Sequence, residues 1–422
     1  MKDRLRPAAG MGPRRFAPIL ILLAFAAAGP ARGGTEEFST FHVESMEEDD
    51  ESVLDHLLVR APADWRAEWE RAPLGLRTAQ GCLTSGQWFT DTDLKLSTPL
   101  GKRARFGLEL NQVAGDIATY DFLDLWFRFP VRFGTLGVMF RPFHDKSRQD
   151  LALAWEQGAD SSAFQLRAIY GFEDLFNNLW AFRQTRVGER SEPYLLHPWE
   201  PALELALRRE RWRAELAGKW LTPSTKGTEP TTPGGPEHHE TLWGTLVRAA
   251  AEVHSGGFTC ELRGWNQQAL GTDQPLDYST GDGSDFRRAW SVEMGVGHRL
   301  ARRVTASVRY HYLERTEHYG PPVGPGRFEA YDRVLQGETV YAFAPWIALR
   351  LGGLYDRITI VKSGVTRYFS YGTRNESRGY FGLTARFGNV SVSGVEGIEL
   401  DPEPYDVWFV HDKGFLQLQA TF

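Results

Sequence analysis

Polar and apolar residues alternate along most of the chain, and the last ten residues show the pattern most clearly. One face of this segment holds only apolar side chains, those of Leu416, Leu418, Ala420 and Phe422. A period of two places successive side chains on opposite faces of an extended strand. The same period recurs in segments throughout the chain, among them residues 103–111, 212–220, 304–312 and 380–387. The pattern predicts a long series of β-strands, each with an apolar and a polar face.

Two architectures produce such strands. In a soluble β-sandwich the apolar face packs into a core, whereas in a membrane β-barrel it faces lipid and the polar face lines the interior. Alternating segments of about ten residues match the strand length that crosses a bilayer. Aromatic residues near the expected strand ends match interfacial girdles, and these are Trp88, Trp126, Trp212, Trp220, Trp290, Trp346 and Trp408. These features favour the membrane barrel, with the soluble sandwich as the alternative.

The links between the predicted strands alternate in length, which is typical of an up-and-down barrel with short periplasmic turns and long extracellular loops. Short links are expected near residues 99–102, 130–132, 158–161, 208–211, 255–257, 299–302, 344–346 and 388–389. Long polar links are expected at residues 143–149, 173–199, 223–240, 270–285, 317–327, 362–376 and 401–412. The prediction is an all-β, antiparallel barrel of about 16 to 18 strands, with 18 favoured. Residues 173–199 are open to three interpretations: an outer loop, an infolded constriction or one more hairpin.

The N-terminus has the composition of an export signal. Basic residues precede an apolar block at residues 16–28, and Gly29, Pro30 and Ala31 follow it. This order is typical of a secretory signal peptide, and the block is too short for a membrane helix. We therefore expect a signal peptide at residues 1–31, a leader at residues 32–73 and the barrel at residues 74–422.

Charge is distributed unevenly between the leader and the barrel. Residues 36–73 hold 12 acidic and 3 basic residues, whereas residues 74–422 hold 41 acidic and 39 basic residues. The absence of a basic excess argues against a nucleic-acid partner. We expect the leader to be acidic, periplasmic, and partly helical or disordered. The alternative is that residues 54–59 and 65–69 fold into the periplasmic mouth of the barrel as a plug.

The signal peptide, the alternating strands and the C-terminal strand ending at Phe422 together resemble bacterial outer-membrane β-barrel proteins. The resemblance covers residues 74–422 as architecture and distinguishes no subfamily within the porin-like class. It implies a location in the bacterial outer membrane, in contact with its lipid. It also implies assembly by the barrel-assembly machinery, which would recognise the C-terminal apolar face formed by Leu416, Leu418, Ala420 and Phe422.

If the polar faces of the clearest strands point inwards, the lumen carries more basic than acidic side chains. The basic candidates are Arg103, Arg105, Arg128, Arg141, Arg167, Arg208, Arg213, Lys219, Arg263, Arg309 and Arg386. The acidic candidates are Glu109, Asp124, Glu204, Glu215, Glu261 and Glu293. Fixed positive charge in a narrow tube raises the local anion concentration. The sequence therefore predicts a porin-like passive channel for small solutes that prefers anions. The alternative is that these charges pair with one another and give no selectivity.

No catalytic, metal or cofactor motif stands out, so we expect neither an enzyme nor a bound cofactor. Ser307 and His311 share a face, but four residues of strand separate them by about 13 Å, too far for a hydrogen bond. The pair His238-His239 is expected in an exposed loop rather than at a metal. Two other functions stay open: a plugged barrel that acts as an adhesin, receptor or scaffold through its outer loops, and an outer-membrane enzyme.

Overall fold

The barrel is seen in a computed structural model of the chain. The structure describes Trp69 and residues 72–82, 88–101, 103–115, 119–141, 149–158, 162–173, 194–196, 199–228, 238–275, 283–319, 326–363, 372–400 and 413–422. The predicted signal peptide, nearly all of the leader and residues 174–193 lie outside these described residues. No helix in the described part is long and apolar enough to cross a membrane.

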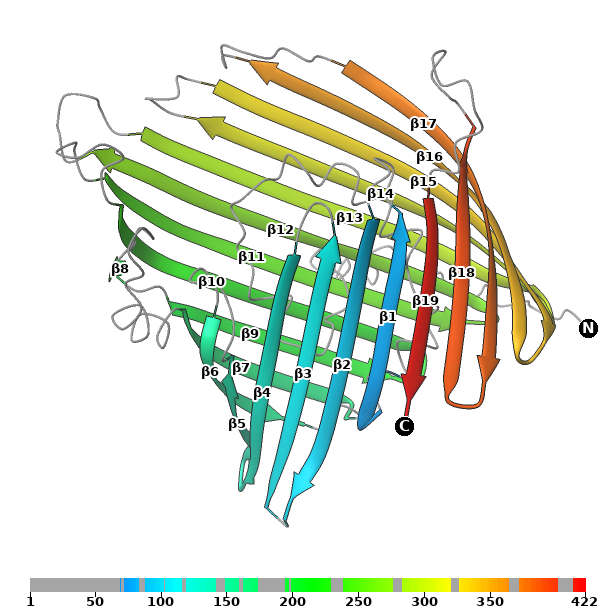
Figure 1. The fold of residues 1–422 in the computed structure, drawn as a ribbon, viewed down its shortest axis with the longest axis horizontal. Coiled ribbons are helices and arrows are strands. Elements are labelled where there is room, and N and C mark those ends of the chain that lie inside the picture. The colour runs from blue at the N-terminus through cyan, green and yellow to red at the C-terminus, as the bar shows by residue number, and fades with distance from the viewer. Residues whose placement is uncertain are drawn as a thin grey trace, which may run out of the picture.

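The described strands form one antiparallel sheet that closes on itself as a barrel of 18 strands (Figure 1). Within the ring, which leaves out β8, each strand pairs with the next along the chain: β7 pairs with β9, and β19 pairs with β1. The strands are β1 (Leu74–Cys82), β2 (Trp88–Leu100), β3 (Ala104–Gly115), β4 (Thr119–Val131), β5 (Gly134–Phe140), β6 (Gln149–Gln157), β7 (Phe164–Glu173), β8 (Tyr194–Leu196), β9 (Trp199–Arg209), β10 (Trp212–Thr228), β11 (His238–Ser255), β12 (Phe258–Pro275), β13 (Gly283–Ala301), β14 (Val304–Tyr319), β15 (Gly326–Ala344), β16 (Ile347–Ser363), β17 (Gly372–Phe387), β18 (Val390–Glu399) and β19 (Lys413–Thr421).

The predicted fold class and the favoured strand count are therefore confirmed. The ambiguous segment 173–199 contributes β8, which pairs with β10 alone among the described strands. It adds no hairpin to the closed ring, so the count stays even.

Short turns gather at one end of the barrel, which we call the short-turn mouth. Several consist of two residues, such as Gly256–Gly257, where both residues have positive φ (58° and 87°) and a side chain would strain the backbone. The first and last barrel strands also meet here: Leu74 N donates to Phe422 O at 3.3 Å, and Phe422 N donates to Leu74 O at 2.9 Å. Both ends of the barrel chain thus lie at the same mouth (Figure 1).

Strands β10 to β17 contain 16 to 19 residues, which is longer than the alternation predicted. Residues 223–240 were expected to be a link, yet β10 continues to Thr228 and β11 begins at His238. The prediction relied on the richness of this segment in proline, glycine and threonine, and Pro223 in particular cannot donate to a ladder. The β10–β11 register shifts between Leu221 and Ser224, and this irregularity accommodates the proline. The histidine pair consequently belongs to a strand rather than to a loop.

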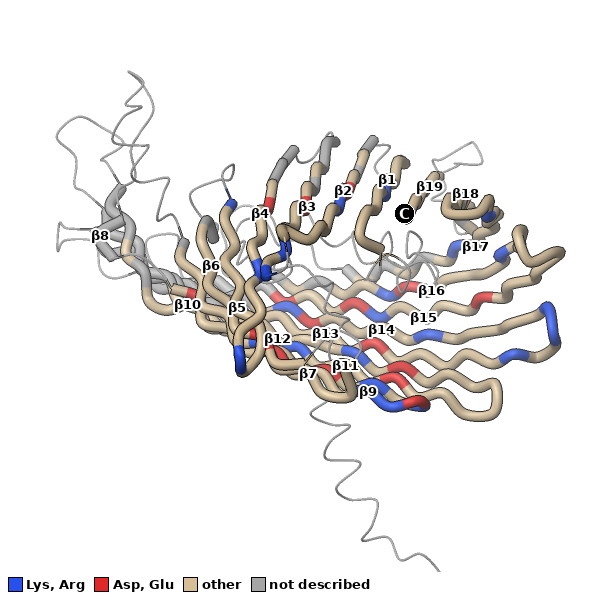
Figure 2. Tube along the Cα trace, turned by 90° about the horizontal axis from the view of Figure 1, so that it is seen from below, with Lys and Arg blue, Asp and Glu red and all other residues tan. Residues whose placement is uncertain are grey.

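The two faces of the wall carry opposite chemistry. Leu351 and Val308 point outwards with 51% and 55% of their surface exposed, whereas Arg378 and Asp124 point inwards and are buried. The predicted C-terminal face follows this rule, since Leu416 and Phe422 are exposed and Gln419 is buried. Figure 2 shows charged positions of both signs on neighbouring strands.

The aromatic residues expected at the girdles divide between the two faces. Trp212, Trp220 and Trp346 point outwards and are exposed, as predicted. Trp126 points inwards and is only 5% exposed, because it shares the inner face with Asp124 and Arg128. Trp126 therefore belongs to the lining and not to a girdle. Trp408 lies outside the described residues.

Candidate functional site: the charged inner wall

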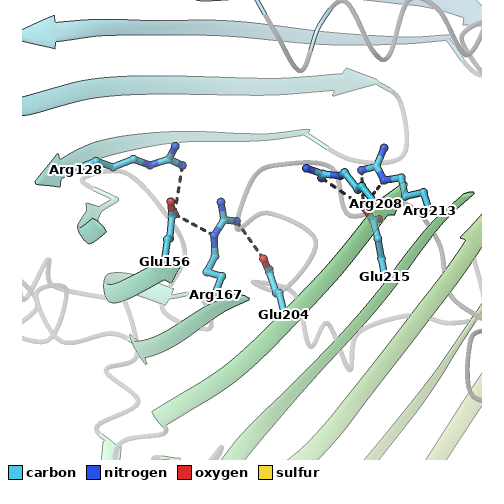
Figure 3. Close-up of polar contacts among 7 residues, drawn as sticks. All are labelled: Arg128, Glu156, Arg167, Glu204, Arg208, Arg213 and Glu215. Carbon is cyan, nitrogen blue, oxygen red and sulfur yellow. Dashed lines mark hydrogen bonds and ion pairs between the residues drawn. The ribbon is translucent and has the colours of Figure 1, made fainter. Parts of the chain in front are cut away.

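Four charged side chains form a continuous set of ion pairs across β4 to β9. Oε1 of Glu156 lies between Arg128 Nη2, at 3.8 Å, and Arg167 Nε, at 3.0 Å. Arg167 Nη1 also donates to Glu204 Oε2 at 3.1 Å (Figure 3). Arg128 reaches across β5 because Gly137, its partner in the ladder, has no side chain. We call these four charged residues the ion-pair ladder.

A second group lies on β9 and β10, where two arginines share one carboxylate. Arg208 Nη2 lies 3.7 Å from Glu215 Oε1, and Arg213 pairs with the same oxygen (Figure 3). Arg213 and Glu215 are two positions apart on one strand and therefore share a face. Arg263 and Glu261 repeat this arrangement on β12, at 3.3 Å. Arg263 is thus balanced by Glu261, whereas Arg208 and Arg213 share the single negative charge of Glu215.

Two ion pairs in the wall are shielded from solvent altogether. Arg141 donates to Asp124 through Nε and Nη2 at 2.6 and 2.7 Å, and both side chains are 0% exposed. Lys219 Nζ lies 2.5 Å from Glu200 Oε2, and both side chains are 1% exposed. A charge at such depth is tolerable only with its partner, because neither has water to solvate it. These pairs act as structural elements of the wall.

A hydrogen-bonded network on β15 to β17 surrounds Glu338. Arg350 Nη2 donates to Glu338 Oε2 at 2.7 Å, and Tyr380 Oη donates to the same oxygen at 3.1 Å. Gln336 Nε2 in turn donates to Tyr380 Oη at 2.8 Å. The network extends the polar lining around the wall, away from the ion-pair ladder.

An apolar area interrupts the charged lining at about half the height of β14 to β19. It consists of six inward side chains, each between 1% and 7% exposed, and we call it the inner apolar patch: Leu313, Val334, Leu354, Tyr380, Val395 and Phe415. Trp265 of β12 packs against its edge. Gly81 and Gly352 accommodate the two rings, because a Cβ at either position would collide with Phe415 or Tyr380. The inner wall is therefore amphipathic rather than uniformly polar.

Three further predicted cations lie outside these groups of ion pairs. Arg309 is half-buried on β14 beside Gly295, and no ion pair joins it to another described residue. Arg105 is exposed and donates to Ser97 Oγ at 3.3 Å. Arg386 donates to the carbonyl oxygen of Gly388 at 3.4 Å, near the short-turn mouth. Arg309 and Arg105 are the best placed to attract an anion.

One predicted lining residue lies elsewhere. Arg103 is exposed in the turn before β3, which begins only at Ala104, so it sits at the mouth and not on the wall. The two remaining acidic candidates lie on strands as predicted. Glu109 is partly buried, opposite Lys95 and Asp124 in the strand register. Glu293 is partly buried opposite His311.

The sequence reasoning missed several acidic side chains of the inner face. These include Asp93, Glu156, Glu200, Asp332, Glu338 and Asp356. The same alternation could have found Glu156, which follows Ala152 and Ala154 on the inner face of β6. With these partners in place, the paired-charge interpretation describes most of the predicted cations.

A serine and a histidine face each other on the inner wall. Ser291 Oγ lies 2.7 Å from His311 Nε2, across β13 and β14. This distance suits a nucleophile and its base, unlike the separation of Ser307 from His311. The backbone N–H groups beside them are engaged in the β13–β14 ladder, which leaves none placed to stabilise an oxyanion. The described geometry therefore supplies a nucleophile and a base, but no backbone donor for an oxyanion.

Comparison with known proteins assigns no family. No protein-family model matches the chain, and neither does any curated protein sequence. Among solved structures, OmpT of Vibrio cholerae is 10% identical with a TM-score of 0.40, over 83% of this chain and 96% of that one. An anion-selective porin from Comamonas acidovorans is 11% identical with a TM-score of 0.35, over 83% of this chain and 97% of the porin. CdiB from Acinetobacter baumannii is 10% identical with a TM-score of 0.42, over 83% of this chain and 60% of CdiB. At these low scores the similarities carry no function to this chain.

Proposed function

We propose that the barrel spans the outer membrane of a bacterium and acts as a porin-like passive channel for small solutes. The observation that carries the proposal is the inverted wall, with apolar side chains outside and charged side chains inside. A continuous apolar outer surface is unfavourable in water, and a bilayer removes that cost. A soluble sandwich would place the same faces the other way round.

The outer surface is layered as a bilayer requires. Exposed aromatic side chains form a ring near the short-turn mouth: Phe129, Phe133, Phe164, Trp212, Phe258, Tyr341, Phe343, Trp346, Phe387 and Phe422. Others lie higher: Trp199, Trp220, Trp243 and Tyr355. The nine residue steps from Trp346, in the turn before β16, to Tyr355 on β16 span about 30 Å, which suits a tilted strand crossing a band about 25 Å tall. Aliphatic residues such as Leu351 fill the level between.

Permeation would be diffusion along the charged lining, and it needs no cofactor. A barrel of this strand number can enclose an aqueous channel. Most inner-wall cations are paired with carboxylates, so their fields largely cancel. The net preference then depends on cations such as Arg309 and Arg105, and we expect it to favour anions weakly.

The test is single-channel recording on refolded residues 32–422 in a planar bilayer under a potassium chloride gradient. A stable open channel whose reversal potential has the sign of an anion preference is the expected result. A cation preference would overturn the assignment of Arg309 and Arg105. A folded barrel with no conductance would instead support the plugged adhesin, receptor or scaffold, which acts through its outer loops.

Arg309→Gln should move the reversal potential towards the cation side, because it removes one inner-wall positive charge that forms no ion pair with a described carboxylate. The double variant Arg213→Gln with Glu215→Gln serves as the control. It removes one positive and one negative group together, so the net charge of the inner wall is unchanged and the reversal potential should not change. Equal shifts in the two variants would contradict the argument.

We propose no catalytic activity, although Ser291 and His311 are hydrogen-bonded. A fluorophosphonate probe should leave Ser291 unlabelled in the folded barrel, because no backbone donor is free beside it to stabilise the transition state. Mass spectrometry of the treated protein gives the readout. Labelling of Ser291 that disappears in His311→Ala would favour the outer-membrane enzyme instead.

We also infer that β19 carries the signal for the barrel-assembly machinery. Leu416 and Phe422 project from the outer face of this strand, and Leu418 and Ala420 occupy the alternate positions between them, Ala420 being only 7% exposed. This surface is available to a membrane partner before β19 pairs with β1 and β18.

A further inference from the structure

A row of hydrogen-bond donors crosses three neighbouring strands on the outer face of the barrel. Arg333 of β15 lies opposite Arg357 of β16 in the strand register, and Arg357 lies opposite Asn375 of β17 (Figure 1). All three side chains are exposed. They point outwards because they alternate with buried inward residues such as Val334 and Asp356. We call Arg333, Arg357 and Asn375 the outer donor row.

Two arginines in direct register are unfavourable unless an anion lies between them. Opposite residues of an antiparallel pair have Cα atoms about 5 Å apart, and like charges at this separation repel each other. Neither Arg333 nor Arg357 forms an ion pair with another described residue. The guanidinium carbon of Arg333 lies 5.8 Å from the ring centroid of Tyr312, a cation–π contact that occupies no N–H group. The described carboxylates therefore leave both charges unbalanced.

Two carboxylates on the same face are bound by tyrosines instead. Tyr312 Oη donates to Glu314 Oε2, and Tyr331 Oη donates to Glu329 Oε2, each at 3.0 Å. These contacts orient both carboxylates without an arginine of the outer donor row.

A third tyrosine orients the amide at the end of the row. Tyr355 Oη donates to Asn375 Oδ1 at 3.1 Å. The carbonyl oxygen of the amide is thus engaged, and its nitrogen stays available as a donor beside Arg357. The row presents two guanidinium groups and one amide to the same outer surface.

The surface between the outer donor row and the short-turn mouth is apolar. Leu335 and Tyr355 lie opposite each other two positions nearer that mouth, and they are 49% and 44% exposed. Leu351, further along β16, is 51% exposed. A step of two residues is about 7 Å along a strand, so Arg357 lies one such step beyond Tyr355, at the upper edge of the proposed hydrocarbon band. The donors therefore lie at the level of lipid headgroups, directly above a surface suited to acyl chains.

We propose that the outer donor row binds the phosphate of a membrane lipid in the leaflet away from the short-turn mouth, with the acyl chains on Leu335 and Leu351. A guanidinium presents parallel N–H groups that match two phosphate oxygens, and the bound anion offsets the repulsion between the two arginines. A lipid fits better than a soluble anion because the apolar surface continues from the donors. This inference rests on the proposed membrane location, and not on conductance through the lumen.

Native mass spectrometry of refolded residues 32–422 in detergent micelles tests the binding, with phosphatidic acid as the probe. The double variant Arg333→Gln with Arg357→Gln should bind it about tenfold more weakly or worse, since charge-assisted hydrogen bonds are lost. The control, Arg209→Gln with Arg302→Gln, also removes two exposed arginines, but these lie at the short-turn mouth and neither faces another arginine in the register. It should bind like the parent. Equal losses in the two double variants, or undiminished binding in the first, would overturn the site.

Competition distinguishes a lipid from other anions. Excess inorganic phosphate or polyglutamate should not displace phosphatidic acid from the parent, because neither contacts the apolar surface. Displacement by inorganic phosphate would overturn the lipid in favour of a soluble anion. Displacement by polyglutamate alone would overturn it in favour of an acidic protein.

Unfolding in vesicles separates the site from the membrane location. Addition of phosphatidic acid to phosphatidylcholine vesicles should raise the urea midpoint of the parent and not that of Arg333→Gln with Arg357→Gln, because a ligand of the folded state stabilises it. An equal rise in both proteins would overturn the site and leave the membrane location standing. A parent that folds in micelles but inserts into neither kind of vesicle would overturn both.

Discussion

Arg141→Met should destabilise the folded barrel by about 3–5 kcal/mol, the largest effect that we expect from one substitution. Arg141 makes two hydrogen bonds to Asp124, and neither side chain has any exposed surface. Removal of the guanidinium leaves a carboxylate that water cannot reach, next to Glu109 in the strand register. Urea unfolding from detergent micelles or vesicles, followed by tryptophan fluorescence and gel mobility, measures the free energy of unfolding.

The double variant Arg141→Met with Asp124→Asn is the control for lost packing. It removes both charges, and a buried pair replaced in this way commonly costs little. Most of the stability should therefore return. A second comparison is Arg213→Gln, whose side chain is 32% exposed and whose loss should cost at most about 1 kcal/mol. A loss below about 1 kcal/mol for Arg141→Met would show that water reaches this pair.

Leu351→Arg should cost about 2–4 kcal/mol when the barrel is folded into phospholipid vesicles. Leu351 projects from the outer face of β16, midway between Trp346 and Tyr355. If these two aromatic residues mark the membrane interfaces, an arginine at position 351 enters the centre of the hydrocarbon layer.

Leu300→Arg provides the matched substitution at another depth. Leu300 is also an exposed outer leucine, but it lies at the end of β13 beside the short-turn mouth. Charged residues near an interface cost only about 0–1 kcal/mol, so this variant should fold almost as well as the parent. Equal and small costs at both positions would mean that water surrounds the barrel at both levels. That result would contradict the membrane proposal.

The arrangement of faces was predictable because a period of two depends only on local geometry. Leu416 and Gln419 lie on opposite sides of β19 in the structure as in the sequence pattern. The strand ends were less predictable, since polar residues that reach water can continue a ladder beyond an apolar band. Pro223 illustrates the point: it suggested a break, but a shift in register lets β10 continue past it.

Most ion pairs of the lining join residues on different strands, and the sequence pattern of one strand does not identify the partner. Arg128 meets Glu156 only because β5 lies between them with Gly137 at the crossing point. Lys219 meets Glu200 diagonally, since its direct partner in the register is Ala202. Arg213 and Glu215, two positions apart on one strand, are the kind of pair that sequence alone can identify. The inward positions were therefore predictable, whereas most of their partners were not.

The hydrogen bonds between Leu74 and Phe422 have a consequence for the order of the strands. They close the ring at the short-turn mouth, where alternate strand connections turn. The junction of β1 and β19 therefore resembles one more hairpin that lacks its connecting peptide bonds. A circular permutant that joins Phe422 to Leu74 by a short linker and opens the chain between Gly256 and Gly257 would retain every strand pairing of the ring. If this permutant folds to the same barrel, the shape of the ring does not depend on which strand comes first in the chain.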